Sequence, residues 1–193
     1  MLKTGRMTVD EYIEEYSKLP DARRYELIEG EVTMSPEASP FHGELQILLG
    51  TLLRLYAARH PGVRVLGPTN VELSEDSCPG PDLTVIAPGD KTRILAKKIS
   101  GSPTVLIEFV SPGKPNYDLV KKRALYIKSQ VPEVWFFDTS KRNAIFLLRE
   151  RSSYSEQRIE KGVFESRLLP GFCLDVGALF DLDLESLREA AKL

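Results

Sequence analysis

Histidine and cysteine are scarce in this chain of 193 residues, and no apolar run is long enough to span a membrane. The two cysteines, Cys78 and Cys173, lie far apart and have no neighbouring His or Cys, which argues against a disulfide framework and against a zinc site. The N-terminal residues also lack the apolar core of a signal peptide. We therefore expect free thiols in a reducing cytoplasm and a protein that does not enter a membrane.

An excess of charge of one sign is also missing, because the formal net charge is −2. This balance argues against a general nucleic-acid coat protein. The charge is nevertheless unevenly spread, since the segment from Lys91 to Arg151 has thirteen Lys and Arg residues against five Asp and Glu residues. Such a segment is typical of a surface that attracts a polyanion, and equally of a solvated basic face on a balanced protein. The composition leaves both interpretations open.

The hydrophobic pattern predicts a mixed α/β fold in one domain over residues 1–193. We expect an N-terminal helix with a hairpin, a mixed central β-sheet flanked by helices, and a C-terminal β-meander. Helices are predicted at residues 9–18, 41–59 and 117–129 and at the acidic C-terminus. Strands are predicted at 24–28, 31–34, 63–66, 71–73, 79–86, 103–110, 134–137 and 144–148, a meander at 154–159 and 163–168, and a loop at 88–102.

Two of the predicted strands each carry one carboxylate in an otherwise apolar run. Asp82 follows Pro81, and Glu108 lies between Ile107 and Phe109. An ionised carboxylate is rarely buried without a partner, because its removal from water is very costly. The pair therefore predicts a cation between the two strands, although Asp82 could instead simply begin its strand.

The helix predicted over residues 117–129 has a polar stripe. Asp118, Lys122 and Tyr126 recur at intervals of four residues and so lie along one side of the helix. If this side faces the sheet, Lys122 approaches Glu108. The alternative is a surface ion pair between Lys122 and Asp118, which would stabilise the helix by only a few tenths of a kcal/mol.

A third acid, Glu26, lies between apolar neighbours in the first hairpin, where it could join this cluster or pair with Arg23 or Arg24. Converging carboxylates repel one another unless a cation intervenes. Hard oxygen ligands without Cys or a His pair favour Mg²⁺, Mn²⁺ or Ca²⁺. A lysine among carboxylates stays protonated, so we expect Lys122 to orient water or to stabilise negative charge on phosphorus.

Several motifs, taken in order, resemble those of one family. Asp82 after a proline, Glu108 in the next apolar strand and Lys122 in the following helix resemble the PD-(D/E)XK phosphodiesterase superfamily. The chain is more closely similar to its small stand-alone bacterial branch of restriction endonucleases. The resemblance extends over nearly the whole chain and rests on the ordered set, because a single Pro-Asp is a weak signal. The matching segments are residues 25–31, His42, 81–83, 107–112, 118–126, 131–135 and 169–172.

The resemblance implies a restriction-endonuclease-like sheet with Asp82 and Glu108 as metal ligands. In the broader superfamily the lysine lies two residues after the acid, where this chain has Val110. In the branch the lysine is displaced to the following helix, which matches Lys122. The turn Gly113-Lys114-Pro115 differs from the Ser/Thr-rich turn usual in the branch, so Lys114 is a rival for the lysine's role.

Further residues are assigned roles around this pair. Glu26 is expected to be an additional catalytic acid near the metal. His42, Asp118 and Tyr126 are expected to lie beside the metal ligands, with His42 more often a helix-end or supporting group than a ligand. Lys114, Lys121 and Arg123 are expected to contact nucleic acid.

We expect an endonuclease that uses Mg²⁺, with Mn²⁺ as a substitute, to hydrolyse phosphodiester bonds in nucleic acid, with DNA as the expected substrate. By analogy it acts as a homodimer, because nucleases of this size often pair to cut both strands. One alternative is a nuclease-fold module that binds nucleic acid or another partner without cutting. A third is a metal-dependent hydrolase of a smaller phosphate ester.

Overall fold

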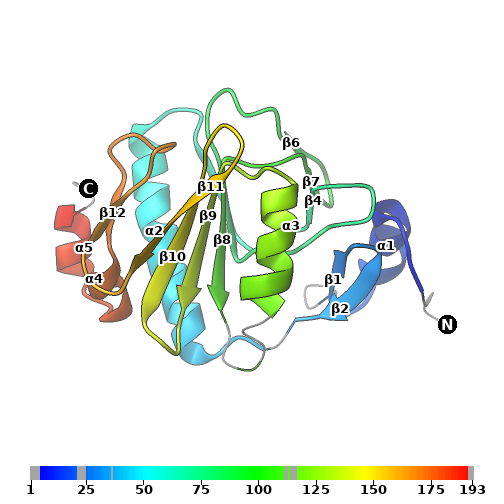
Figure 1. Cartoon of the computed structure of the whole chain (residues 1–193), viewed down its shortest axis with the longest axis horizontal. Coiled ribbons are helices and arrows are strands. Elements are labelled where there is room, and N and C mark those ends of the chain that lie inside the picture. Colours follow the sequence, from blue (N-terminus) through cyan, green and yellow to red (C-terminus); the bar gives the residue numbers. More distant parts are fainter. Residues whose placement is uncertain (1–4, 21–24, 36, 111–112, 114–116, 191–193) are drawn as a thin grey trace.

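A six-stranded mixed sheet lies at the centre of the molecule (Figure 1). In the computed structural model, which describes residues 5–20, 25–35, 37–110, 113 and 117–190, the strand order is β11-β10-β9-β8-β5-β3. β8 and β9 are parallel, and the other neighbours are antiparallel. The strands are β3 (Arg64–Leu66), β5 (Leu83–Ile86), β8 (Val105–Val110), β9 (Glu133–Asp138), β10 (Asn143–Arg149) and β11 (Tyr154–Ile159).

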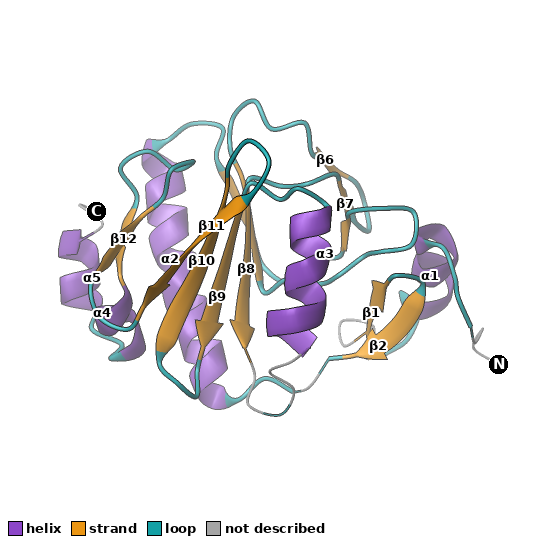
Figure 2. Cartoon of the chain, in the orientation of Figure 1, coloured by secondary structure: helices purple, strands orange, loops and turns teal. Residues whose placement is uncertain are grey.

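Helices cover both faces of this sheet (Figure 2). In the view of Figure 1, α3 (Arg123–Lys128) lies in front of the sheet and α2 (Pro40–Arg59) lies behind it. β8 and β9 are therefore buried at every position. Strands that are covered on both faces are continuous apolar runs in the sequence, which explains the apolar residues on both sides of Glu108.

The alternation of side chains along β8 decides which helix each residue meets. Leu106 and Val110 pack into the apolar cluster that contains α3, and Glu108 points to the same side. The residues between them join the cluster that contains α2; these are Val105, Ile107 and Phe109. The single acid of this strand therefore faces α3.

The back layer is built around α2, which confirms the helix predicted over residues 41–59. Ser39 caps it by accepting a hydrogen bond from the backbone N–H of His42, and Pro40 occupies the first turn. Its apolar stripe packs on the sheet and consists of Leu45, Leu49, Leu52, Leu53 and Tyr56. The layer is completed by β12 (Val163–Glu165), β13 (Cys173–Asp175), α4 (Val176–Phe180) and α5 (Leu184–Ala190).

The N-terminal unit consists of α1 (Val9–Tyr16) and the hairpin of β1 (Tyr25–Ile28) and β2 (Glu31–Met34), as predicted. Thr8 and Glu11 form a capping box at the start of α1. The hairpin turns at Glu29-Gly30, where both residues have positive φ. Leu27 exchanges backbone hydrogen bonds with Cys78, which connects the hairpin to the segment that leads into Asp82.

The loop predicted at residues 88–102 contains two short strands, so this prediction was wrong in part. β6 (Arg93–Ile94) and β7 (Ile99–Ser100) form a small sheet with β4 (Val71–Glu72). The polar composition of the segment concealed them, because only Ile99 in these two strands is buried. Pairing with β4 was decided by distant contacts rather than by a local pattern.

The meander predicted to join residues 154–159 to 163–168 is also wrong. Among the described strands, β11 pairs with β10 alone, and after Gly162 the chain leaves the central sheet so that β12 pairs with β13. Phe164 explains the departure, because its ring stacks on Phe146 with centroids 3.6 Å apart and meets Trp135 edge-on. Burial of this ring on the back face favours the new course.

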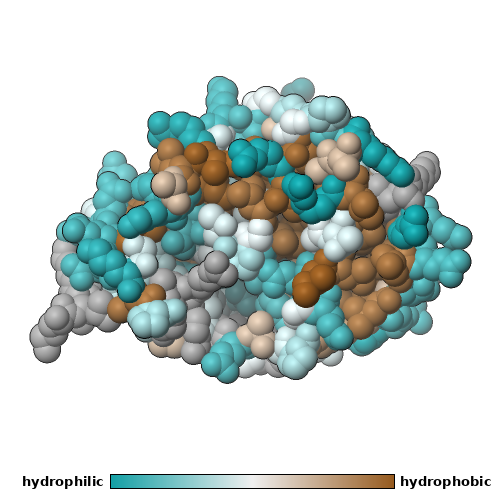
Figure 3. Space-filling model, turned by 180° about the vertical axis from the view of Figure 1, so that it is seen from behind, coloured by the Kyte–Doolittle hydropathy of each residue, from teal (hydrophilic) through white to brown (hydrophobic). Residues whose placement is uncertain are grey.

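Within the described residues, no helix is both long and apolar enough to cross a membrane. The view from behind, on the side that α2 covers, shows hydrophobic residues at the surface among hydrophilic ones (Figure 3). The assignment of residues 1–193 to one domain stays a prediction.

Candidate active site

The two predicted metal ligands lie side by side because of the register between β5 and β8. Leu83 pairs with Ile107 in antiparallel register, so Asp82, one residue earlier, is adjacent to Glu108, one residue later. The sequence predicted a strand over residues 79–86 that includes Asp82. In the structure β5 begins at Leu83, so Asp82 lies immediately before the strand. The proximity of the two acids, which lie far apart along the chain, is thus a consequence of strand pairing.

Asp82 is held in place by both neighbouring elements. Its Oδ2 accepts a hydrogen bond of 2.7 Å from the backbone N–H of Phe109, and its Oδ1 lies 3.1 Å from His42 Nε2. The side chain of Gln46, one turn after His42 on α2, donates to the Asp82 backbone carbonyl at 2.9 Å. His42 therefore lies beside a predicted metal ligand, as expected.

Glu108 meets the polar stripe of the following helix. Its Oε1 accepts a hydrogen bond of 3.0 Å from Lys122 Nζ and a second, short hydrogen bond from the Tyr126 hydroxyl. Glu108 and Lys122 are 3% and 4% exposed. The alternative in which Lys122 forms only a surface pair with Asp118 is therefore wrong, although Asp118 Oδ1 does lie 3.7 Å from Lys122 Nζ.

Glu26 joins the same cluster from the hairpin. Its Oε1 lies 2.8 Å from Lys122 Nζ and accepts a hydrogen bond of 2.8 Å from the backbone N–H of Gly80. Glu26 is 2% exposed, so this acid is not a surface residue of the hairpin. The neighbouring Arg23 and Arg24, its alternative partners, lie outside the described residues.

A π-helical turn aligns the stripe. Residues Tyr117–Lys122 form this turn, and α3 continues from it. In an α-helix each step of four residues overshoots a full turn by about 40°. The wider π-helical turn winds more slowly, so the step from Asp118 to Lys122 does not add to the overshoot between Lys122 and Tyr126. Lys114, the rival for the role of the lysine, lies outside the described residues.

The electrostatics of the cluster favour a protonated lysine among acids. Burial raises the pKa of Glu108 well above its ordinary value; Lys122 lowers it, whereas the charges of Asp82, Asp118 and Glu26 raise it further. Burial alone would lower the pKa of Lys122, but the carboxylates of Glu108 and Glu26 raise it well above the ordinary value. Lys122 is therefore a fixed positive charge and not a free base.

Two of the residues predicted to contact nucleic acid differ in their surroundings. Lys121 is exposed on the outer side of the helix. Arg123 instead forms an ion pair with Glu156 of β11, with Nη2 and Oε2 2.7 Å apart. Arg123 is thus directed toward the sheet edge and away from the carboxylate cluster.

Three residues of the site were missed by the sequence reasoning: Gln46, Gly80 and Tyr117. Gln46 could have been found, because it lies four residues after His42 on the same side of a strongly predicted helix. Gly80 acts through its backbone N–H, which leaves no side-chain signal. The Tyr117 ring lies 5.7 Å from Lys122 Nζ; burial raises the pKa of its hydroxyl, and the charge of Glu26 raises it further.

The donor set fits a hard divalent cation. The carboxylates of Glu26, Glu108 and Asp118 lie 2.8, 3.0 and 3.7 Å from the ammonium of Lys122. The charge of Asp82 acts on Glu108, so the cluster contains four acids and one lysine. Glu26 Oε2 is buried, and no hydrogen bond of ordinary geometry reaches it from the described residues, although the Tyr117 hydroxyl lies close to Glu26. Within the described ranges, no three acidic, His or Cys side chains converge as a ready metal cage. Mg²⁺ does not need such a cage, because it is often held by two carboxylates with water and substrate phosphate.

Comparisons with known proteins agree with this architecture. Residues 13–177 match the model of a family, Uma2, described as "Putative restriction endonuclease". A crystal structure described as a putative nuclease belonging to DUF820, from Anabaena variabilis ATCC 29413, superimposes with a TM-score of 0.71 at 18% identity, over 88% of this chain and 97% of that chain. This likeness confirms the predicted restriction-endonuclease-like fold. Among proteins with curated descriptions, none matches the chain.

Proposed function

We propose, given that the chain belongs to the Uma2 family of restriction-endonuclease-like proteins, that it is a Mg²⁺-dependent endonuclease that hydrolyses phosphodiester bonds in DNA. One observation supports this most strongly: Asp82 and Glu108 are neighbours across two strands, and Glu108 contacts the buried Lys122. The word "restriction" in the family's description favours DNA over RNA as the substrate.

Asp82 and Glu108 would hold the metal. Each carboxylate oxygen can accept two hydrogen bonds, so the contacts of Asp82 with His42 and Phe109 leave a lone pair on each oxygen for a metal. When bound, Mg²⁺ would lower the pKa of a coordinated water and neutralise charge that develops on the phosphate. His42 and the Phe109 N–H fix the orientation of Asp82 in readiness for this role.

Lys122 would act through its charge. Its ammonium contacts Glu108 and Glu26 at 3.0 and 2.8 Å, and its charge lowers the pKa of Glu108, which burial raises. In a site with little water, a fixed cation stabilises negative charge far better than it would in bulk solvent. Tyr126 donates to the same oxygen of Glu108 and so restrains the carboxylate. Glu26 would be the additional acid that holds Lys122 in place.

The proposal predicts metal-dependent cleavage. Supercoiled plasmid incubated with the protein and Mg²⁺ or Mn²⁺ should be nicked or linearised, and EDTA should stop the reaction because the carboxylates then lack their cation. Agarose gels measure the products. The Asp82→Asn variant, purified in the same way, controls for a contaminating nuclease. Single-stranded DNA, RNA and a small aryl phosphodiester form the other arms. No product from any substrate with either metal would contradict hydrolysis, and turnover of the small ester alone would assign a different substrate.

A catalytically silent module is the second candidate function. It is favoured by the burial of Glu108 and Lys122, which leaves only 3% and 4% of these residues exposed to a substrate. Such a module would bind DNA in a salt-sensitive way without forming product. The plasmid assay, together with a binding measurement, separates it from the endonuclease.

We also propose that the protein is a homodimer formed through α2. Ile47 and Leu55 are 73% and 42% exposed and lie four residues on either side of Thr51. In an antiparallel pair of α2 helices centred at Thr51, Ile47 of each copy therefore meets Leu55 of the other, and Glu44 approaches Arg59. A groove of about 700 Å³ between α2 and β3 adjoins these residues. A dimer would supply the two sites needed to cut both strands.

Light scattering should therefore give twice the mass of one chain, 21.7 kDa. Ile47→Glu should yield a monomer, because two buried carboxylates would be added to the symmetric contact. Ile94→Glu, at an exposed site on β6, should remain dimeric and is the matched control. A wild-type protein with the mass of one chain, or dimers of both variants, would contradict this interface.

The cytoplasm is proposed as the location. Cys78 and Cys173 are both free thiols, which suits a reducing compartment.

A further inference from the structure

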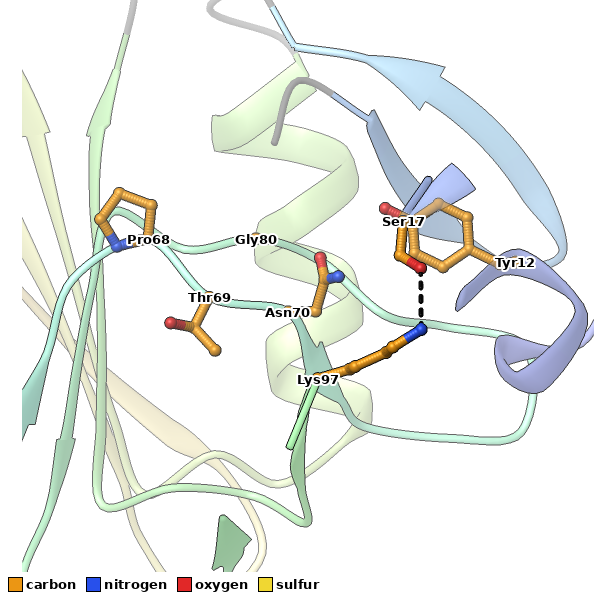
Figure 4. A pocket seen from close by; sticks show the side chains of 7 residues that line it. All are labelled: Tyr12, Ser17, Pro68, Thr69, Asn70, Gly80 and Lys97. Carbon is orange, nitrogen blue, oxygen red and sulfur yellow. Dashed lines mark hydrogen bonds between the residues drawn. The ribbon is translucent and has the colours of Figure 1, made fainter. Parts of the chain in front are cut away.

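Figure 4 shows a polar cavity of about 200 Å³. It adjoins the carboxylate cluster through Gly80, whose backbone N–H donates to Glu26. Its walls come from four separate parts of the chain: α1 with the residue that follows it, the connection between β3 and β4, the connection between β4 and β5, and the segment between β6 and β7. Gly80 contributes backbone, and the lining residues are Tyr12, Ser17, Pro68, Thr69, Asn70, Gly80 and Lys97. No acidic residue is among those of the described chain that line this cavity, unlike the neighbouring cluster.

The cavity presents hydrogen-bond donors. Lys97 Nζ reaches Ser17 Oγ at 3.3 Å, and the ammonium keeps further N–H groups for a ligand. The Asn70 side chain lies between Gly80 and Lys97 in the view of Figure 4, and its amide can donate to an anion. Thr69 adds a hydroxyl. One cation and several neutral donors, without a carboxylate, are suited to a single anionic group.

Gly80 places the cavity next to the candidate active site. Its backbone N–H donates to Glu26 Oε1, and the same oxygen lies 2.8 Å from Lys122 Nζ. Gly80 is also only two residues before Asp82. A side chain at Gly80 would begin 3.4 Å from Glu26 Oε1 and 4.0 Å from Asn70 Oδ1, so only this small residue separates the two polar regions.

We propose that this cavity binds a second, non-scissile phosphate group of the nucleic acid, held by Lys97, Asn70 and Thr69. The inference rests on the proposed function. A site with four carboxylates repels the polyanion that it must hold, so an adjacent cationic subsite would offset the repulsion and set the position of the strand. The phosphate can be an internal phosphodiester or a terminal phosphomonoester, since the chemistry of recognition is the same for both.

The test introduces one negative charge without a change of shape. Asn70→Asp should weaken the binding of a short fluorescent DNA duplex, measured by anisotropy without metal, on the order of tenfold, because a hydrogen bond to phosphate is replaced by repulsion. Gln157→Glu, on exposed β11, adds the same charge far from the cavity and should change the affinity less than about twofold. Thermal melting monitored by circular dichroism checks that both variants are folded.

A second pair of variants tests the cation independently. Lys97→Gln should lower the slope of log affinity against log salt by about one unit, as expected for one lost phosphate contact. Lys91→Gln, at an exposed lysine between β5 and β6, should leave the slope unchanged. Duplexes with a 5′-phosphate or a 5′-hydroxyl distinguish the two sources: a terminal phosphate is assigned if Asn70→Asp weakens only the phosphorylated duplex, and an internal one if it weakens both.

Equal losses for the cavity variants and their controls, or no loss for any of them, would overturn the subsite. If wild-type protein still cleaves DNA in either of those cases, the proposed function stands and only the subsite fails. A wild-type protein that neither binds nor cleaves DNA would overturn both.

Discussion

Replacement of Lys122 by methionine is expected to lower the free energy of unfolding by about 3–5 kcal/mol, because it leaves buried carboxylates without their cation. Lys122 is 4% exposed, and its ammonium contacts Glu108 and Glu26 directly. Methionine retains the length and apolar stem of the side chain, so most of the change comes from the lost charge. Urea unfolding measured by circular dichroism provides the free energy.

The matched control for this variant is Lys121→Met. Lys121 precedes Lys122 in the same π-helical turn but is exposed, so the expected loss is within about 0.5 kcal/mol. In the Lys122→Met background, a second change of Glu108→Gln should restore part of the stability. Equal losses for the two lysine variants, or a further loss in the double variant, would show that Lys122 does not compensate these acids.

The loss in Lys122→Met should also depend on pH. Without Lys122, the pKa of the buried Glu108 rises further above its value in the unfolded chain. A carboxylate with a raised pKa in the folded state destabilises that state when the pH rises above the unfolded pKa, and has no such effect below it. The deficit of the variant should therefore be largest at neutral pH and should shrink as the pH falls toward the ordinary pKa of glutamate.

Asp82→Asn is expected to reduce metal-dependent cleavage about a thousandfold, equivalent to about 4 kcal/mol of transition-state stabilisation, because it removes an anionic metal ligand. Asparagine has the same shape, and its oxygen can still accept from the Phe109 N–H while its amide donates to a neutral His42. The fold should therefore be retained. Rates of plasmid nicking with Mg²⁺ measure the effect.

Metal binding gives a readout for Asp82→Asn that does not require turnover. Calorimetric titration of Mn²⁺ should show an affinity at least about tenfold weaker than that of the wild-type protein, as expected when one of two carboxylate ligands is lost. Asp181→Asn is the control, because Asp181 pairs with Arg142 through an exposed contact outside the site. Unchanged Mn²⁺ affinity in Asp82→Asn, or an equal decrease in Asp181→Asn, would remove Asp82 from the metal site.

The Lys122 and Asp82 variants separate two aspects of the cluster. Lys122 is buried among the acids that it neutralises, so we expect its replacement to lower the free energy of unfolding before any other property. Asp82 lies just before the start of β5 and is held by groups that asparagine can also satisfy. We therefore expect its replacement to weaken metal binding and cleavage while the fold is retained. A wild-type protein without activity would remove the catalytic role of both residues but not the stability effect of Lys122.

The residues of the site could be identified from local patterns. Glu108 was conspicuous because it interrupts an apolar strand. The polar stripe was conspicuous because its residues, Asp118, Lys122 and Tyr126, recur at helical spacing. Polar Gln46 could have been identified in the same way on α2. Neighbouring residues along the chain determine such periodicities, so no knowledge of distant partners was needed to predict the strand around Glu108 or the two long helices.

What required the tertiary structure was the pairing of segments that are far apart in the chain. The register of β5 and β8 brings Asp82 beside Glu108, the hairpin carries Glu26 to Lys122, and the backbone of Gly80 joins Glu26 to the neighbouring cavity. The departure of β12 from the central sheet follows in the same way from the stacking of Phe164 on Phe146. Asp82 and Glu108 were thus recognisable as acids in unusual places from the sequence alone. Only the folded chain decided that they are adjacent, because strand register and ring packing depend on contacts that are not local in sequence.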